Sequence, residues 1–407
     1  MRARVGPAFA TVLIVLLSLL PVSLTVRAQA PAAPPARIDI TYIGLTQSRT
    51  LPLSYLDQPP ADEGVQGARL ALADNETTGR FVGQDYHLDE AIVPDGAGAV
   101  DAFKKSVAAG ARLFVTDLPA PTLLQIADLP EAKGLTIIDA TAEDDSLRGQ
   151  DCRANVLHTM PSRAMLADAL MQYLVVKRWT NILLIVGQED ADKAYADAIR
   201  ASAKKFRIKI VQEIPWTFDP GARRTDTGHY AVQAEVARVT QGAPDYDLLV
   251  VADEADNFGD DLAYRTTSPR PIAGTEGLVA SAWARPFEQW GATQLQSRFL
   301  KQAHRWMTDR DYGAWMAVRA IGEAATRSGS ADPTTIGAFM RGKDFDLAAF
   351  KGTKLTFRDW DGQLRQPVLL ADSRSLVSVS PQQGFLHQVS ELDTLGVDRP
   401  ETKCKLH

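Results

Sequence analysis

The sequence predicts an α/β protein with two doubly wound lobes, each built around a parallel sheet. Short apolar segments alternate with amphipathic helical segments along the chain, which is the pattern of βαβ units. The alternation occurs in two series, and the second begins after Cys152. Without its first thirty residues the chain has about 377 residues, which is enough for two ordinary domains.

The first series shows the periodicities of helices and of strands clearly. In GVQGARLALAD the residues Val65, Ala68 and Leu72 recur at the three- to four-residue spacing of a helix. YHLDEAI alternates polar and apolar residues as a half-buried strand does. The predicted strands of this series are 38–44, 86–92, 113–115 and 135–139, and the predicted helices are 64–74, 97–109 and 121–129.

The second series repeats this alternation. SRAMLADALMQYLVVK predicts a long amphipathic helix, and LLVVA is the most apolar strand segment of the chain. Near the C-terminus, Asp361-Gly362 predicts a hairpin turn between two antiparallel strands. The predicted strands are 181–187, 209–214, 248–252, 272–274, 355–357 and 367–370, and the predicted helices are 162–177, 192–205, 231–239, 293–308 and 312–327.

Residues 1–30 predict a secretion signal that is not part of the fold. Arg2 and Arg4 are positive, and TVLIVLLSLL (11–20) is an apolar core of the length that a signal peptide needs. The small-x-small pattern AQA, which ends at Ala30, is typical of a cleavage site. The alternative is a membrane anchor, but the apolar run is shorter than the roughly 20 residues that span a bilayer. We therefore expect export, cleavage after Ala30, and a Pro/Ala-rich lead-in at 31–36.

The charge balance excludes two classes of partner. Cleavage removes Arg2, Arg4 and Arg27, so the formal net charge changes from −6 to −9. A nucleic-acid-binding protein needs a basic surface, and anionic membranes attract basic segments. The acidic chain is therefore expected to bind neither nucleic acid nor an anionic membrane surface.

Cys152 and Cys404 are the two cysteines of the chain. In an oxidising compartment an even count favours a disulfide. This bond would connect the C-terminal tail (401–407) to the middle of the chain, and the chain-entropy model gives it roughly 4–5 kcal/mol of stabilisation before strain. The alternative is two unrelated thiols. The count itself excludes a Cys-rich metal site.

The sequence contains no recognisable catalytic or cofactor motif. Neither GxGxxG nor GxxxxGK[ST] occurs, and the GxSxG motif of α/β-hydrolases is absent. The six histidines show no paired metal-ligand spacing. We therefore expect a binding protein without a cofactor, and an enzyme on this scaffold is the less favoured alternative.

The order and spacing of five segments resemble the type I periplasmic binding proteins of ABC transporters, of the branched-chain amino-acid-binding kind. The resemblance covers essentially the whole mature chain. Two further stretches, 147–170 and 291–324, are similar to the subgroup associated with PQQ-dependent alcohol dehydrogenase systems. The five segments are GVQGARLALADNETTG (64–79), the helix–strand–helix region 160–206, YDLLVVADEADNFG (246–259), IAGTEGL (272–278) and LTFRDWDGQLRQPVLL (355–370).

This resemblance implies a particular architecture and set of partners. It implies two lobes joined by a three-strand hinge, with residues 37–155 and 275–342 in lobe one and residues 156–274 and 343–400 in lobe two. It also implies a periplasmic monomer that closes around a small molecule or ion and delivers it to an ABC permease in the inner membrane. A PQQ dehydrogenase system is a further partner that the subgroup implies.

The ligand is expected in the cleft where the carboxyl ends of the strands of both lobes face each other. By the resemblance, Glu276 in GTEG would hold a ligand ammonium and Tyr195 would close over the ligand from lobe two. The candidate ligand-binding residues are Thr46, Ser48, Thr116, Asp117, Thr141, Glu143, Glu189, Tyr195, Asp253, Glu254 and Glu276.

The cleft departs from the family in its charge. Glu143, Asp144 and Asp145 occupy the place where the family has small neutral and hydroxyl residues for a carboxylate, and Asp253-Glu254 lies where a second aromatic residue is usual. An anionic ligand would meet like charges there, so a free amino acid is disfavoured and a cation is favoured.

A hard metal ion is one such cation, because it takes six to eight oxygen ligands. The subgroup's dehydrogenases carry calcium or a lanthanide, which makes such an ion worth testing. The alternative is that these acids cap the helices that follow the strands. The candidate metal ligands are Glu143, Asp144, Asp145, Asp253 and Asp256.

The sequence therefore predicts the substrate-binding component of an ABC transporter. The alternative is a sensor or accessory protein that uses the same cleft to assist a periplasmic dehydrogenase. The fold does not distinguish these two functions.

Overall fold

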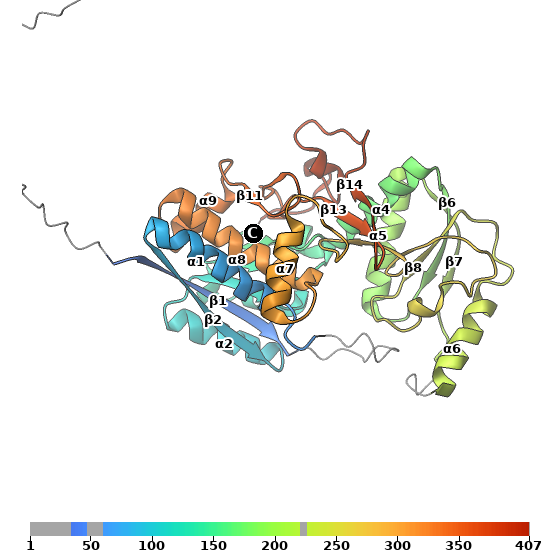
Figure 1. The fold of residues 1–407 in the computed structure, drawn as a ribbon, viewed down its shortest axis with the longest axis horizontal. Helices are drawn as coiled ribbons and strands as arrows, with labels where there is room; N and C mark the ends of the chain where they lie inside the picture. Colours follow the sequence, from blue (N-terminus) through green and yellow to red (C-terminus); the bar gives the residue numbers. More distant parts are fainter. Residues whose placement is uncertain (1–33, 47–59, 220–225, 407) are drawn as a thin grey trace, which may run out of the picture. The chain divides into compact units, whose positions relative to one another are not determined.

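The computed structural model describes residues 34–46, 60–219 and 226–406. In these residues the fold is α/β, with two mostly parallel sheets and helices on their faces (Figure 1). The predicted secretion signal and Ser48 lie outside the described residues. None of the helices in the described ranges has both the length and the hydropathy of a membrane span.

The first sheet is parallel, with strand order β2-β1-β3-β4-β5. The inner strands β1, β3 and β4 are largely buried, as expected where helices cover both faces of a sheet, whereas the edge strand β2 alternates buried and exposed residues. In β1, Ile38 and Ile40 belong to one buried core, whereas Ile43 belongs to the core formed with α2 and α3. The elements are β1 (Ala36–Leu45), α1 (Val65–Val82), β2 (Gln84–Val93), α2 (Gly96–Ala108), β3 (Leu113–Asp117), α3 (Ala120–Ala127), β4 (Thr136–Asp139) and β5 (Val156–His158).

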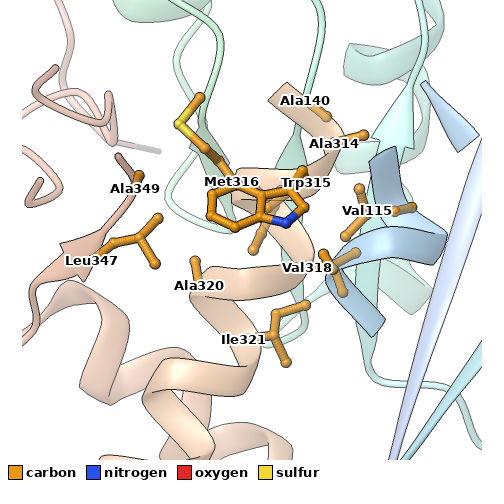
Figure 2. Close-up of a cluster of buried hydrophobic side chains, with 14 of the residues drawn as sticks. Val115, Ala140, Ala314, Trp315, Met316, Val318, Ala320, Ile321, Leu347 and Ala349 are labelled. Carbon is orange, nitrogen blue, oxygen red and sulfur yellow. The ribbon is translucent and has the colours of Figure 1, made fainter. Parts of the chain in front are cut away.

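Three later helices complete the first lobe. They are α7 (Ala292–Ala303), α8 (Asp309–Ser328) and α9 (Pro333–Arg341). Helices α1 and α8 lie side by side (Figure 1), and the close approach requires glycine, since a Cβ on Gly67 would lie 1.8 Å from the carbonyl oxygen of Asp311. Figure 2 shows part of the core around Trp315, a residue of α8 whose side chain is 1% exposed.

The second sheet has the order β14-β13-β10-β9-β8-β6-β7, with β13 and β14 antiparallel to their neighbours. Alternate residues of β8 face opposite sides: Leu248 and Val250 pack in the core with α4 and α5, and Leu249 packs in the core with α6. The elements are α4 (Arg163–Lys177), β6 (Asn181–Val186), α5 (Asp190–Phe206), β7 (Lys209–Pro215), α6 (Asp226–Val239), β8 (Leu248–Ala252), β9 (Ile272–Gly274), β10 (Leu278–Ser281), β13 (Val368–Ala371) and β14 (Leu376–Ser380).

In the described residues the chain passes between the two lobes after β5, after β10 and before β13. This arrangement confirms the predicted fold class of two lobes joined by three connections. The boundaries predicted at 274/275 and 342/343 differ from the cores that form. Strand β10 pairs with β9 and β13 in the second sheet, whereas Phe345 and Leu355 pack in the first core, next to the short strands β11 (Leu347–Ala348) and β12 (Lys354–Leu355).

Two predicted elements differ from the structure, and one helix was not predicted. The predicted hairpin 355–370 is wrong: Phe357 and Leu364 form one antiparallel bridge around the turn, but β12 pairs with β11 and β13 pairs with β10 and β14. The helix predicted at 293–308 ends at Ala303, because His304 adopts a left-handed backbone conformation with φ 58°. Helix α9 was not predicted, because its sequence PTTIGAFMR is short and contains both Pro and Gly.

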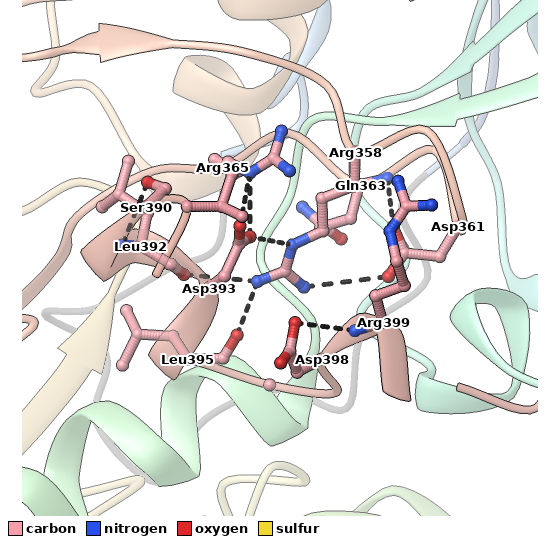
Figure 3. Close-up of polar contacts among 12 residues, drawn as sticks. Arg358, Asp361, Gln363, Arg365, Ser390, Leu392, Asp393, Leu395, Asp398 and Arg399 are labelled. Atoms are coloured by element: carbon pink, nitrogen blue, oxygen red, sulfur yellow. Dashed lines mark hydrogen bonds and ion pairs between the residues drawn. The ribbon is translucent and has the colours of Figure 1, made fainter. Parts of the chain in front are cut away.

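The C-terminal segment is fixed by an arginine that is 2% exposed. The Arg358 guanidinium donates to Asp393 Oδ1 at 3.0 Å and to the carbonyl of Leu395 at 2.8 Å (Figure 3). Arg365 donates to the same Asp393 carboxylate at 2.8 Å. Beyond this cluster, Cys404 forms a disulfide with Cys152, 252 residues earlier in the chain, which confirms the predicted pair.

Candidate functional site

Polar side chains gather where the chain leaves the strands, and Arg163 organises the largest group. It is the first residue of α4, and its Nε and Nη2 atoms donate to the two carboxylate oxygens of Glu254 at 2.7 and 2.6 Å. Its Nη1 lies 3.7 Å from Asp144. The planar guanidinium matches a carboxylate in this two-bond geometry. Arg163 therefore joins the loop after β4 to the loop after β8.

Glu143 and Tyr195 lie beside this pair. Burial raises the pKa of Glu143 above its usual range, and the negative charge of Glu254 raises it further, while Arg163 opposes both. Burial also raises the pKa of Tyr195, with smaller contributions from the charges of Glu254 and Glu143. Tyr195 is 4% exposed and packs in the core of the second lobe. Four of the predicted site residues, Glu143, Asp144, Tyr195 and Glu254, are thus brought together around Arg163.

A second group contains only carboxylates. Asp256, Asp260 and Glu276 each place one carboxylate oxygen within 4.8 Å of the others. Burial raises the pKa of Glu276 to about 9, and the charge of Asp260 and a hydrogen bond with it raise it further. At neutral pH Glu276 is therefore protonated, so it can donate a hydrogen bond to Asp260.

A third group lies at the carboxyl end of β3. Asp117, which is 2% exposed, accepts hydrogen bonds from Tyr42 Oη at 2.9 Å and Thr141 Oγ1 at 2.8 Å. Arg310 of α8 also donates to Asp117, and its Nε lies 3.8 Å from Glu63. Asp117 and Thr141, both predicted site residues, are therefore held by neighbours in their own lobe.

Several predicted site residues cap backbone groups. Asp253 accepts hydrogen bonds from the backbone N–H groups of Asn257, Phe258 and Gly259 at 2.7–3.0 Å. Asp145 Oδ1 accepts from the backbone N–H of Ala164 at 2.9 Å, at the start of α4. Glu189 is exposed and forms a capping box with Asp192 at the start of α5. These contacts agree with the alternative interpretation of the acidic residues, in which they cap backbone N–H groups after the strands.

The remaining predicted residues take no part in these groups. The Thr116 side chain is fully buried and donates to the carbonyl of Ile138 at 3.5 Å. Thr46 is exposed at the end of β1, where its backbone N–H donates to Val93 at 2.8 Å. Ser48 lies outside the described residues.

The prediction missed Arg163 and Arg310, although both carry a recognisable signal. Each lies in the first turn of a helix, after the capping residues Ser162 and Thr308 respectively. A cation in the first turn is unfavourable for an isolated helix, because the N-terminus carries partial positive charge. Such a residue therefore indicates an anionic partner elsewhere in the fold, and the partners are Glu254 and Asp117.

A cavity of about 1000 Å³ adjoins the carboxylate group. It runs beside β9 and β10, and its lining includes Asp260, Glu276, Trp283 and Asp309. Burial raises the pKa of Asp309 to about 7, although its carboxylate accepts a hydrogen bond from the backbone N–H of Trp283 at 2.7 Å. The lining does not include Glu143, Tyr195 or Glu254, although the charge of Asp309 contributes to the raised pKa of Glu143.

The five predicted metal ligands do not form one cluster. Asp145 and Asp253 accept backbone N–H groups, and Asp144 lies next to Arg163. Asp256 instead joins Asp260 and Glu276, which is the one group of at least three potential ligands that the described ranges contain. Carboxylate oxygens are the ligands that Ca²⁺ prefers, but three are fewer than the six to eight that it takes.

Comparison with known proteins identifies the class of protein that this fold defines. Residues 58–375 match the family model described as periplasmic binding protein, and the chain belongs to this family. No curated protein matches the sequence.

Three solved structures illustrate the likeness in fold. A solute-binding protein of an ABC transporter from R. palustris, in complex with benzoate, has 13% identity and a TM-score of 0.65 over 91% of this chain and 100% of its own. A branched-chain amino-acid ABC transporter ligand-binding protein from Burkholderia xenovorans has 16% identity and a TM-score of 0.64, over 84% and 95%. The branched-chain amino-acid binding protein LivJ of Streptococcus pneumoniae, in complex with isoleucine, has 15% identity and a TM-score of 0.62, over 84% and 98%.

Proposed function

We propose that this protein is the exported substrate-binding component of an ABC transporter and that its ligand is a small cation. The match of residues 58–375 to the periplasmic binding protein family supports the transport function. The observation that carries the ligand class is the position of Glu276, whose carboxyl group lies beside Asp260 and Asp256 at the edge of a large cavity. Capture would bury the ligand and pair its charge, and no bond would be made or broken.

The charge of the site favours a cation over the amino acids that some of the similar structures bind. The carboxyl groups of Glu276, Asp260 and Asp309 line the same cavity, whose lining also includes Asp372, Arg285 and Arg374. Because the pKa of Glu276 is raised to about 9, this group holds a proton at neutral pH in the free protein. A bound cation would replace that proton, so we expect cation binding to release a proton and to strengthen as the pH rises towards 9.

The test is a thermal-shift screen of the protein beginning at Pro31. The screen would include amino acids, organic amines such as putrescine, short alcohols and acids, PQQ, Ca²⁺ and La³⁺. A ligand at 100 times its dissociation constant stabilises the protein by about 2.7 kcal/mol, which is readily measured. We expect a shift with a cation that is lost in Glu276→Gln and kept in Glu131→Gln, which alters an exposed carboxylate elsewhere. A shift with neutral or anionic compounds alone would refute the cation proposal.

A metal ion is the second candidate ligand, and the group formed by Asp256, Asp260 and Glu276 is the observation that favours it. The similarity of 147–170 and 291–324 to the PQQ-associated subgroup supports a link to an alcohol dehydrogenase system. In that case the protein would be a sensor or accessory protein for the dehydrogenase, and it would still act as a monomer. Affinity capture with the permease or with the dehydrogenase distinguishes the two functions.

A further inference from the structure

A second cavity, of about 550 Å³, lies between α7, the loop that precedes it and the turn between β13 and β14. The loop contributes Arg285 and Phe287, α7 contributes Gln296, and the turn contributes Arg374. This cavity adjoins the larger one through Arg285 and Arg374, but Gln296 and Trp306 line only the smaller. Neither Glu276 nor any other residue of the carboxylate group is part of its lining.

Two guanidinium groups line this cavity without an anionic partner among the described residues. The Arg285 guanidinium lies 4.3 Å from the centre of the Trp306 ring, and Arg285 forms no ion pair with another described residue. Stacking on an aromatic ring leaves the N–H edge of a guanidinium available for a carboxylate. The Asp372 carboxylate is close to Arg374 in sequence, but it accepts from the backbone N–H groups of Arg374 and Ser375, at 2.6 Å each. The Arg374 side chain is exposed and pairs with no carboxylate of residues 34–46, 60–219 or 226–406.

The wall of the cavity also contains an unsatisfied amide. Gln296 is 4% exposed, and neither its Nε2 nor its Oε1 has a hydrogen-bond partner in the part of the chain that the structure describes. A buried amide without partners is unfavourable in a folded protein, so such groups are uncommon outside functional positions. The neighbouring hydroxyls of Thr293 and Ser297 already donate to backbone carbonyls, at 3.2 and 2.8 Å. The Nε2 group of this amide can donate a hydrogen bond to a ligand carboxylate.

We propose that this cavity, which adjoins the cation site and shares Arg285 and Arg374 with its lining, is a second binding site for a small dicarboxylate. Each of the two arginines would take one carboxylate, and these arginines come from segments more than eighty residues apart in the chain. Charge-assisted bonds from guanidinium to carboxylate are about twice as strong as neutral hydrogen bonds. The one carboxylate in the lining, that of Glu288, leaves the cavity with net positive charge on an otherwise acidic protein.

Isothermal titration with succinate tests this proposal, with acetate and the neutral succinamide as comparison ligands. We expect succinate to bind, acetate to bind more weakly and succinamide not to bind. Arg285→Ala and Arg374→Ala should each weaken succinate binding roughly tenfold or more, because each removes a charge-assisted bond. Gln296→Leu should also weaken binding, and it should not lower the melting temperature, since it removes an unpaired amide.

The matched control is Arg80→Ala, which removes an exposed arginine at the end of α1. It should leave succinate affinity unchanged. The proposal is wrong if succinate does not bind, or if the Arg285 and Arg374 variants bind it as the unaltered protein does. It is equally wrong if Arg80→Ala weakens binding as much as they do, because the attraction would then be a general effect of charge.

Discussion

Replacing Glu276 by glutamine tests the electrostatics of the proposed cation site without any knowledge of the ligand. In the folded protein the pKa of Glu276 is raised to about 9, first by burial and then by Asp260. In the unfolded chain a glutamate titrates near 4.3. Between these two values the folded state binds a proton that the unfolded state does not bind. The contribution of Glu276 to stability is therefore most favourable at low pH and falls as the pH rises through this window.

The size of the effect follows from linkage. When the folded state binds one proton more than the unfolded state, the free energy of unfolding falls by about 1.4 kcal/mol for each unit that the pH rises. The loss of stability between pH 5 and pH 8 therefore has an upper limit of about 4 kcal/mol. The actual loss will be smaller, because Glu276 is partly exposed and water screens its neighbours. Glutamine keeps a donor for Asp260 and cannot titrate. The Glu276→Gln variant should therefore have a flatter pH dependence and should be more stable than the unaltered protein at pH 8.

Urea unfolding followed by circular dichroism at pH 5, 6.5 and 8 measures these differences. Other buried carboxyl groups, such as Glu143 and Asp309, contribute equally to both proteins, so the difference between the two curves isolates Glu276. Glu131→Gln is the control, and its curve should run parallel to that of the unaltered protein. If the Glu276→Gln curve is also parallel, Glu276 is ionised at neutral pH and the reasoning is refuted.

Three further predictions concern stability. Asp253→Ala leaves the buried N–H groups of Asn257, Phe258 and Gly259 without their acceptor, so we expect a loss of about 3–5 kcal/mol in urea unfolding and a smaller loss for Asp253→Asn. Cys404→Ser should lower the free energy of unfolding by about 2–5 kcal/mol. A reducing agent should lower the melting temperature of the unaltered protein to that of the variant. If the two proteins have equal melting temperatures without reductant, this expectation is contradicted. Gly67→Ala should cost about 1–3 kcal/mol, because its Cβ would lie 1.8 Å from a backbone oxygen of α8; an unchanged urea midpoint would show that the two helices can separate without loss.

Local patterns in the sequence were sufficient for most of the fold. The predicted strand 248–252 is β8 with the same bounds, and the helix predicted at 162–177 is α4 within one residue. Hydrophobic periodicity indicates which face of a helix or strand is buried, and it can be read from residues that are close together in the sequence. The predicted hairpin 355–370 failed because strand partners are chosen by the whole sheet: β13 pairs with β10, about ninety residues earlier.

In the candidate site the difference between what the sequence predicts and what packing decides is larger. The sequence alone determined the acidic composition of the loops after the strands, the two cysteines and the family. Only the tertiary structure decided which acid caps a helix, which pairs with an arginine and which lies beside another acid. Asp145 caps a helix that begins eighteen residues later, and Glu254 pairs with Arg163, 91 residues away. The reason is physical: the charge and pKa of a carboxyl group depend on atoms within a few ångströms, and packing brings those atoms from distant parts of the chain.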